Sequence, residues 1–417
     1  MPVQHFRALR STILGLLVLG GIVNFLDRSA LSIANTTIRG DLHLSATAVG
    51  ALLSIFSLAY GLAQVPAGWL LDRFGPRLIL SAGMMLWSAA QVATGMVSSF
   101  AWLAMTRIGL GVGEAPFLPG GFKVVHDWYE VPERGLPTGI LNASTTLGQA
   151  FAPPLLTLLL LRYGWRSMFI AIGLLGVVIA LAWYPVYREA PKPENDKAIV
   201  KASARDWRWL LKQQTLWGMM LGFSGVNYTA WLYLAWLPGY LEAAHHLSLA
   251  KTGWLAAIPF LMGSAGMLIS GWTADALVRR RADPLRSRKL LVVSGMVCSA
   301  ACTFAVTRAA SSGSAVAIIG MALFFIHFAG TSAWGLVQVA APARLVGTVG
   351  ATQNFSSFLF ASIAPLLTGW ILDRTHSFQI ALVVCACVTF LGALAYLGLV
   401  RQPMAEDQLV SSMRISS

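Results

Sequence analysis

Charged side chains are scarce in this sequence. Only 11% of its 417 residues are Asp, Glu, Lys or Arg, whereas 56% are hydrophobic and the mean hydropathy is +0.67. Soluble globular domains carry roughly 25% charged residues, so the composition excludes an ordinary soluble protein and indicates a polytopic membrane protein. A bilayer-crossing helix needs about 20 apolar residues, so the chain has room for about a dozen spans.

Cysteine is also rare, and the four that occur lie inside two apolar runs without a histidine or acid nearby in sequence. We interpret them as small buried hydrophobic side chains, not as metal ligands or disulfide partners. No arrangement of a nucleophile and a base rises above chance either. The sequence therefore argues against an enzyme, and we expect no metal and no organic cofactor.

Apolar runs predict an all-α membrane protein with twelve transmembrane helices. We place the spans at residues 12–34, 48–71, 78–97, 100–122, 136–160, 166–186, 213–239, 252–272, 290–307, 313–338, 346–369 and 378–400. Because Asn24, Asp27 and Arg28 interrupt the first run, we read it as a retained span and not as a cleaved signal peptide.

The net charge of +13 follows the predicted topology. Of 30 Lys and Arg residues, 22 lie on the side of both termini, six on the opposite side and two within spans. Positive charge is retained in the cytoplasm, so we expect both termini to be cytoplasmic and see no reason to invoke nucleic acid. The expected location is the bacterial inner membrane, and nothing in the sequence calls for an oligomer.

An internal repeat divides the chain into two halves. The loop GWLLDRFGPR (68–77) parallels GWTADALVRR (271–280), and PERGLPTGILN (132–142) parallels PARLVGTVGATQN (342–354), at offsets of 203 and 210 residues. Matching loops at a nearly constant offset indicate duplication. We therefore predict two pseudo-symmetric six-helix bundles, 1–186 and 213–417, joined by a polar cytoplasmic linker at 187–212.

The loop GWLLDRFGPR also resembles the signature of the major facilitator superfamily. Further segments, among them LDRSALSIA, RIGLGVGEAPFLPG and NYTAWLYLAWLPGYL, resemble the anion:cation symporters of that superfamily. This group includes hexuronate, galactonate, glucarate and phthalate-type carriers and the vertebrate organic-anion SLC17 proteins. The resemblance covers nearly all spans and implies a secondary transporter with alternating access.

Four charged residues fall within the predicted spans: Asp27, Arg28, Arg107 and Glu114. A charge at the bilayer centre costs about 2.5–3.5 kcal/mol on insertion scales, so such residues are retained for a reason. Arg107 and Glu114 are seven residues apart and share one helix face. The set could be an ion-pair network that only fixes packing, or it could let protonation of a carboxylate free an arginine for a substrate anion.

The family resemblance favours the second interpretation. It implies that Asp27 and Glu114 couple transport to protons, that Arg28 lies near the substrate and that Arg107 pairs with Glu114. It also places Tyr60, Tyr228, Trp334 and Asn354 at pocket positions. Thr145 falls where sugar-acid carriers often have a glutamine, which leaves aromatic carboxylates open as alternative substrates.

Two further groups remain open at this point. His327 stands alone in an apolar helix, where it could form a helix–helix hydrogen bond, contact a ligand or relay protons. In the repeated loops, Asp72, Arg73, Arg77 and Asp275 are read as a cytoplasmic gate latch.

Together these features predict a carrier that imports a small organic acid anion, with a sugar acid such as a hexonate, hexarate or hexuronate favoured. Its expected partners are the carboxylate substrate, protons as the coupling ion and the lipid bilayer. The alternatives are a carrier of phthalate-type or hydroxyphenylacetate-type acids, a proton-antiporting exporter, sodium coupling, and a non-transporting sensor of an organic acid.

Overall fold

The computed structural model describes residues 3–130, 133–188, 203–279 and 283–404, which are helical apart from short connections and contain no strand. The helices are α1 (Val3–Ile33), α2 (Asn35–Leu42), α3 (Ala46–Met96), α4 (Phe100–Glu114), α5 (Phe117–Trp128), α6 (Gly135–Val186), α7 (Ala204–Leu210), α8 (Gln214–His245), α9 (Leu249–Arg279), α10 (Pro284–Val306), α11 (Ser312–Ala340), the 3₁₀ turn η2 (Ala343–Leu345), α12 (Val346–Ala361), α13 (Ile363–Thr375) and α14 (Gln379–Leu399).

Two of these helices are each long enough for two spans. The 51-residue α3 reverses at Gly75 (φ 77°) and the 52-residue α6 at Gly164 (φ 78°). A positive φ is open to glycine at no steric cost but strained for other residues, so these glycines set the hairpins between the paired spans.

All twelve predicted spans are accounted for, and the all-α membrane fold is confirmed. Eight described helical segments are apolar and long enough to cross a membrane, and two of them are the double-length helices. The remaining two spans are α8 and the broken pair α4–α5, which is interrupted at Ala115 and Pro116. A similar break at Ser362, three residues before Pro365, separates α12 from α13.

By their contacts, the residues sort into two compact units. Unit 1 comprises Met1–Asp196, Leu234–Ala257 and Pro365–Thr375; unit 2 comprises Lys197–Tyr233, Ile258–Ala364 and His376–Ser417. Two short segments of the second half thus group with the first half. The predicted division at the linker remains a prediction.

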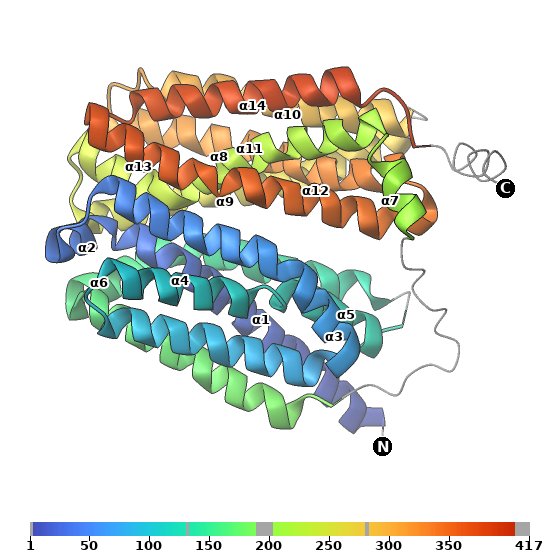
Figure 1. Cartoon of the computed structure of the whole chain (residues 1–417), viewed down its shortest axis with the longest axis horizontal. Coiled ribbons are helices and arrows are strands. Elements are labelled where there is room, and N and C mark those ends of the chain that lie inside the picture. The colour runs from blue at the N-terminus through green and yellow to red at the C-terminus, as the bar shows by residue number, and fades with distance from the viewer. Residues whose placement is uncertain (1–2, 131–132, 189–202, 280–282, 405–417) are drawn as a thin grey trace. The chain divides into compact units, whose positions relative to one another are not determined.

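In unit 1, α1 packs against α6, and α3 packs against α4 and α6 (Figure 1). The segment Pro365–Thr375 joins this unit at the start of α3. The Asp373 carboxylate accepts hydrogen bonds from the backbone amides of Ala46 (2.9 Å) and Thr47 (2.7 Å) and from the Thr47 hydroxyl. The first amides of a helix have no partner within it, so Asp373 caps α3 from a distant part of the chain.

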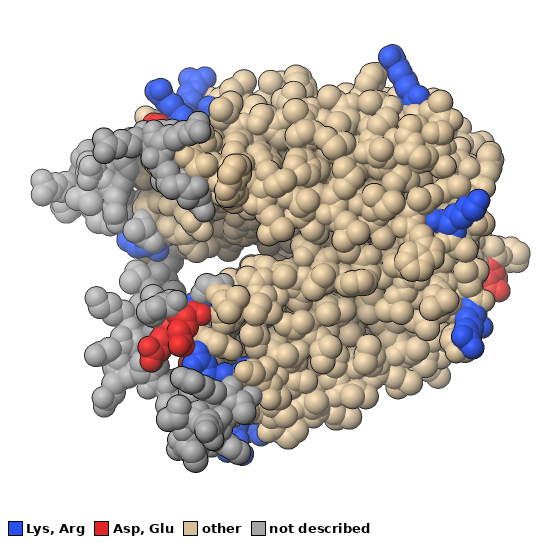
Figure 2. Space-filling view, turned by 180° about the vertical axis from the view of Figure 1, so that it is seen from behind, with Lys and Arg blue, Asp and Glu red and all other residues tan. Residues whose placement is uncertain are grey.

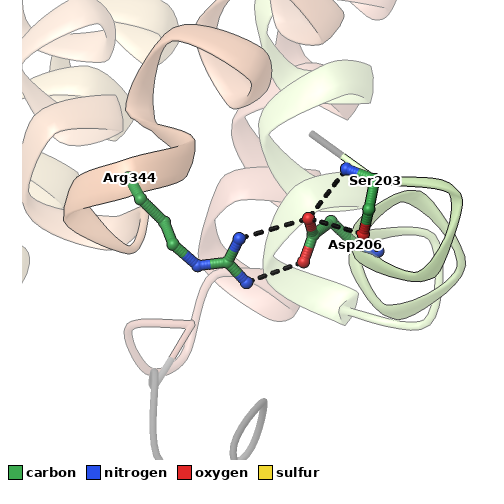
Figure 3. Close-up of polar contacts among 3 residues, drawn as sticks. All are labelled: Ser203, Asp206 and Arg344. Atoms are coloured by element: carbon green, nitrogen blue, oxygen red, sulfur yellow. Dashed lines mark hydrogen bonds and ion pairs between the residues drawn. The ribbon is translucent and has the colours of Figure 1, made fainter. Parts of the chain in front are cut away.

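In unit 2, α10 packs against α11 and α14. The short helix α7 is attached through Asp206, whose carboxylate accepts two hydrogen bonds from Arg344 in η2, at 2.7 and 3.1 Å (Figure 3). The same carboxylate accepts from the amide and hydroxyl of Ser203 in a capping box. Hydrogen bonding from Arg344 holds the pKa of Asp206 well below its usual range.

On one face of the molecule (Figure 2), the described charged residues avoid the middle of the surface. On the face in Figure 2, the described Lys, Arg, Asp and Glu side chains gather at the two ends of the helices, and the broad band between them carries other residues. Such a band is what a hydrocarbon environment requires. Cys385 is buried as predicted, whereas Cys387 is exposed, so for that residue the prediction of burial was wrong.

Candidate functional site: a buried charge cluster in unit 1

The four charged residues predicted within spans lie together in unit 1. Asp27 and Glu114 are fully buried, Arg107 is 2% exposed and Arg28 is 8% exposed. Electrostatically, Asp27 interacts with all three of the others. Only one further charged residue in the described chain, Asp206, is buried to this degree. The predicted cluster is therefore a real feature of the protein interior.

Two glycines bring α4 close enough to build this cluster. A Cβ atom on Gly111 would meet the Phe56 carbonyl oxygen at 2.7 Å and the Tyr60 amide nitrogen at 2.9 Å, and one on Gly113 would meet the Trp87 amide nitrogen at 2.6 Å. Any side chain there would collide with the backbone of α3. The glycine-rich run at 109–114 thus serves close helix packing, as in other membrane bundles, and carries Glu114 up to α1.

Arg28 forms an ion pair with Glu114 inside a ring of aromatic side chains. Its Nε donates to the Glu114 carboxylate at 2.7 Å. The guanidinium carbon lies 4.5 Å from the ring centre of Tyr60, 4.9 Å from that of Phe25 and 5.5 Å from that of Phe56. Aromatic faces attract a cation, more strongly where water is excluded. Tyr60, predicted at a pocket position, is thus in contact with Arg28.

Arg107 has a different set of partners from the one expected. Its Nη2 donates to the Gln91 side-chain oxygen at 3.0 Å and to the Thr94 hydroxyl at 2.9 Å, both on the second limb of α3. Glu114 pairs with Arg28 instead, so the expected pairing of Arg107 with Glu114 does not occur in this structure. Sequence reasoning missed Gln91 and Thr94, although their spacing of three places both on one helix face.

Asp27 is the exception within the cluster. Neither of its carboxylate oxygens has a hydrogen-bond partner among the described residues, although the residue is fully buried. A buried carboxylate that accepts no hydrogen bond costs more than a neutral carboxylic acid. Asp27 is therefore suited to hold a proton in this conformation.

Comparison with known proteins shows the family of this chain. The sequence profile of the Major Facilitator Superfamily matches residues 17–365. The chain belongs to the major facilitator superfamily. It is 53% identical to the probable L-galactonate transporter of Escherichia coli (strain K12) over 97% of this chain and 92% of that protein. It is 30% identical to the hexuronate transporter of Bacillus subtilis (strain 168) over 92% of this chain and 93% of that protein.

A solved structure supports the fold. The bacterial homologue of the human lysosomal transporter Spinster superposes with a TM-score of 0.81 over 94% of this chain and 97% of that one, at 19% identity. As a member of this superfamily the protein is a multi-pass membrane transporter and not an enzyme. The curated relatives match the anion:cation symporter branch predicted from the sequence.

The pocket residues predicted in the second half of this transporter lie in unit 2. Tyr228 on α8 is 5% exposed, whereas Trp334 on α11 is 43% exposed and makes an edge-to-face contact with Phe223 at 5.8 Å. The backbone carbonyl of Asn354 on α12 accepts a hydrogen bond from Ser357. These positions stay predictions for substrate contact.

Two other predicted residues, His327 and Thr145, contact neighbouring groups of the protein. The His327 imidazole packs against Gly263 of α9, where a Cβ would meet its Nε2 at 3.2 Å. This contact agrees with a role between helices. The Thr145 hydroxyl donates to the Asn142 carbonyl of its own helix at 2.7 Å.

The predicted gate residues differ from one another. Asp72 is exposed, and Arg73 lies over the rings of Trp69 and Phe74 at 5.1 and 5.3 Å. Arg77 donates to the Tyr184 carbonyl at 2.9 Å. The side chain of Asp275 lies outside the described residues. The gate role stays a prediction.

Proposed function

We propose that this transporter imports a sugar acid anion together with protons, by alternating access, with L-galactonate as the first candidate substrate. The observation that carries the coupling is the buried, unpartnered carboxylate of Asp27 beside two arginines. The identity to the probable L-galactonate transporter of E. coli supports the substrate class.

Arginine suits the recognition of such an anion. Its guanidinium presents several donors in a rigid fork that matches a carboxylate. Arg28 uses Nε for Glu114, while its buried Nη2 has no hydrogen-bond partner among the described residues. We assign this free donor, with Tyr60 beside it, to the substrate carboxylate.

The transport cycle follows from charge balance. With Asp27 protonated, Arg28 and Glu114 cancel and Arg107 leaves one net positive charge, which an incoming carboxylate neutralises. With Asp27 ionised, the cluster is neutral without substrate and the anion is no longer favoured. Glu114 is the second proton-coupling carboxylate, because its protonation releases Arg28 for the substrate. Proton and anion then leave together once the site opens to the cytoplasm.

An aromatic carboxylate is the second candidate substrate. The Thr145 hydroxyl donates its proton to its own helix and can therefore only accept a hydrogen bond from a sugar hydroxyl, while the half-exposed Trp334 offers an aromatic surface. We favour the sugar acid because of the relatives.

We place the protein in the bacterial inner membrane as a monomer, with both termini cytoplasmic. The excess of Lys and Arg on the side of the termini supports this orientation. Protons are the proposed coupling ion, without any other cofactor.

The test is proton movement in proteoliposomes that contain a pH dye. L-Galactonate, D-galactonate, glucuronate, phthalate and hydroxyphenylacetate are added outside in turn, with and without sodium. We expect internal acidification with a sugar acid, and its loss in Asp27→Asn and Glu114→Gln, while exchange of labelled substrate at equal pH persists in at least one of the two. Thr352→Ser, on α12 of unit 2, is a control that keeps its hydroxyl.

Normal acid-driven accumulation in both carboxylate variants would contradict proton coupling through this site. Sodium-dependent uptake without acidification would identify a different coupling ion. Acidification by phthalate or hydroxyphenylacetate alone would establish the second candidate, and alkalinisation would indicate an exporter.

A further inference from the structure

The cluster holds two unequal sites for the Arg107 guanidinium. One is the pair of neutral acceptors, the Gln91 side-chain oxygen and the Thr94 hydroxyl, which it occupies at 3.0 and 2.9 Å. The other is the Asp27 carboxylate, which lies within its electrostatic range but makes no ion pair with it. Opposite charges buried together attract strongly, so the occupied site needs an explanation.

The neutral site is built to hold a cation. Gln91 and Thr94 are fully buried, and the Thr94 hydroxyl donates its one proton to the Ala90 carbonyl at 2.8 Å or to the Thr106 hydroxyl at 3.0 Å. Either bond leaves the hydroxyl oxygen free to accept from Arg107. The Gln91 amide nitrogen has no partner in the described chain, so Gln91 is oriented by Arg107 alone.

We propose that Gln91 and Thr94 are positioning residues that hold Arg107 away from Asp27 and thereby keep Asp27 able to bind its proton. This inference rests on the proposed proton symport. While Asp27 is neutral, Arg107 stays on Gln91 and Thr94. When Asp27 loses its proton to water, its negative charge attracts Arg107 away from Gln91 and Thr94 and towards the Asp27 carboxylate. The two acceptors compete with that charge, so their strength sets how tightly the proton is held.

Few other charges bear on this balance. Arg28 on α1 and Glu114 on α4 neutralise each other, and Tyr60 is the only titratable residue on the first limb of α3 before Asp72. The second limb of α3 has no charged residue after Arg77, and α6 has none before Arg162. The titratable groups of α5, which also contacts α1 and α3, form pairs near its C-terminal end: Lys123, His126 and Asp127.

The test is the pH dependence of labelled L-galactonate exchange in proteoliposomes with equal pH on both sides. Exchange requires protonated Asp27, so it falls as pH rises. In the double variant Gln91→Leu/Thr94→Val, Arg107 loses its neutral acceptors and moves to Asp27. We expect the midpoint of the fall to shift to lower pH by about one unit, the lower end of what an adjacent opposite charge produces.

Two further variants separate positioning from a loss of packing. Thr94→Ser keeps the hydroxyl and should keep the wild-type midpoint even if its stability drops. Thr94→Val alone should shift the midpoint in the same direction by a smaller amount, and it is the deciding variant if the double variant does not fold.

An unchanged midpoint in Thr94→Val and in the double variant would overturn the positioning role while leaving proton symport intact. Equal shifts in Thr94→Ser and Thr94→Val would overturn it as well. If wild-type protein showed no acidification with any acid, the proposed symport itself would fail, and this inference with it.

Discussion

The polar interiors of the two units are built from different chemistry. Unit 1 buries two acids and two arginines within its spans, whereas the described spans of unit 2 rely on neutral pairs, and the one buried acid of unit 2, Asp206, lies outside the spans in α7. Thr229 and Thr389 lie 2.5 Å apart, Ser270 and Ser332 2.8 Å, and Tyr233 and Thr303 3.1 Å, each measured between hydroxyl oxygens. Hydroxyl pairs keep their partners at any physiological pH, but ion pairs change when a proton arrives. Sensitivity to protons is thus concentrated in unit 1.

The largest effect should come from breaking the Arg28–Glu114 pair. Arg28→Met leaves Glu114 buried without a partner, and removing one member of a buried pair costs about 3–5 kcal/mol. The double variant Arg28→Met/Glu114→Leu should regain most of the lost stability, since an apolar pair can replace a buried ion pair. Thermal unfolding in detergent measures both.

A transport assay should separate the stability of these variants from their function. Neither variant should exchange labelled substrate, because each lacks the arginine assigned to the carboxylate. A double variant that transports, or a single variant as stable as wild type, would contradict the functional contrast between the units.

A smaller effect is expected at the duplicated arginines. Arg344 donates to the Asp206 carboxylate, whereas its repeat partner Arg134 donates to the backbone carbonyls of His126 and Tyr129. Arg344→Ala removes the charge-assisted bonds of a partly exposed pair, together worth about 1.5–3 kcal/mol. We expect a lower thermal midpoint at pH 7 than for wild type.

The pH dependence should differ between these arginines. The pKa of Asp206 is lowered in the folded protein, so its contribution is present above the usual carboxyl range and is lost as pH falls below about 4. The stability gap between wild type and Arg344→Ala should shrink there, while the gap for Arg134→Ala, whose hydrogen bonds go to backbone carbonyls, should not. Parallel gaps would refute the assigned role of Asp206.

The smallest effect is expected in the neutral interior of unit 2. Thr229→Val or Thr389→Val alone leaves one hydroxyl without its partner and should cost about 1 kcal/mol. Replacing both should cost less than the sum, because the bond between the two hydroxyls is lost only once, and in each single variant the remaining hydroxyl still bonds a carbonyl of its own helix. In all three variants the pH profile of transport should match wild type, and a shifted profile would show that unit 2 takes part in coupling.

The sequence was enough to predict the twelve spans and the charge cluster. Apolar runs of sufficient length and four charges within them are local signals, and the spacing of Arg107 and Glu114 places both on one face. Which arginine pairs with Glu114 was not predictable. Both interact with it electrostatically, and Arg107 is hydrogen-bonded instead to Gln91 and Thr94, which look ordinary within an apolar run.

Contacts between residues far apart in the sequence could not be predicted either. Asp206 and Arg344 are 138 residues apart, and Asp373 is 327 residues from Ala46. Asp373 lies in GWILDR (369–374), which resembles GWLLDR (68–73) in the superfamily signature loop. That similarity was a usable signal, but it does not say which helix the acid would meet.

The Asp373 cap ties the first turn of α3 to a segment from the second half of the sequence. The amides of Ala46 and Thr47 are shielded by a carboxylate from the second half of the sequence and not by their own helix. Whenever that segment moves away, both amides open to water and their protons become exchangeable. The rate of hydrogen exchange at these two amides would therefore report how often the second-half segment separates from α3, without any label or ligand.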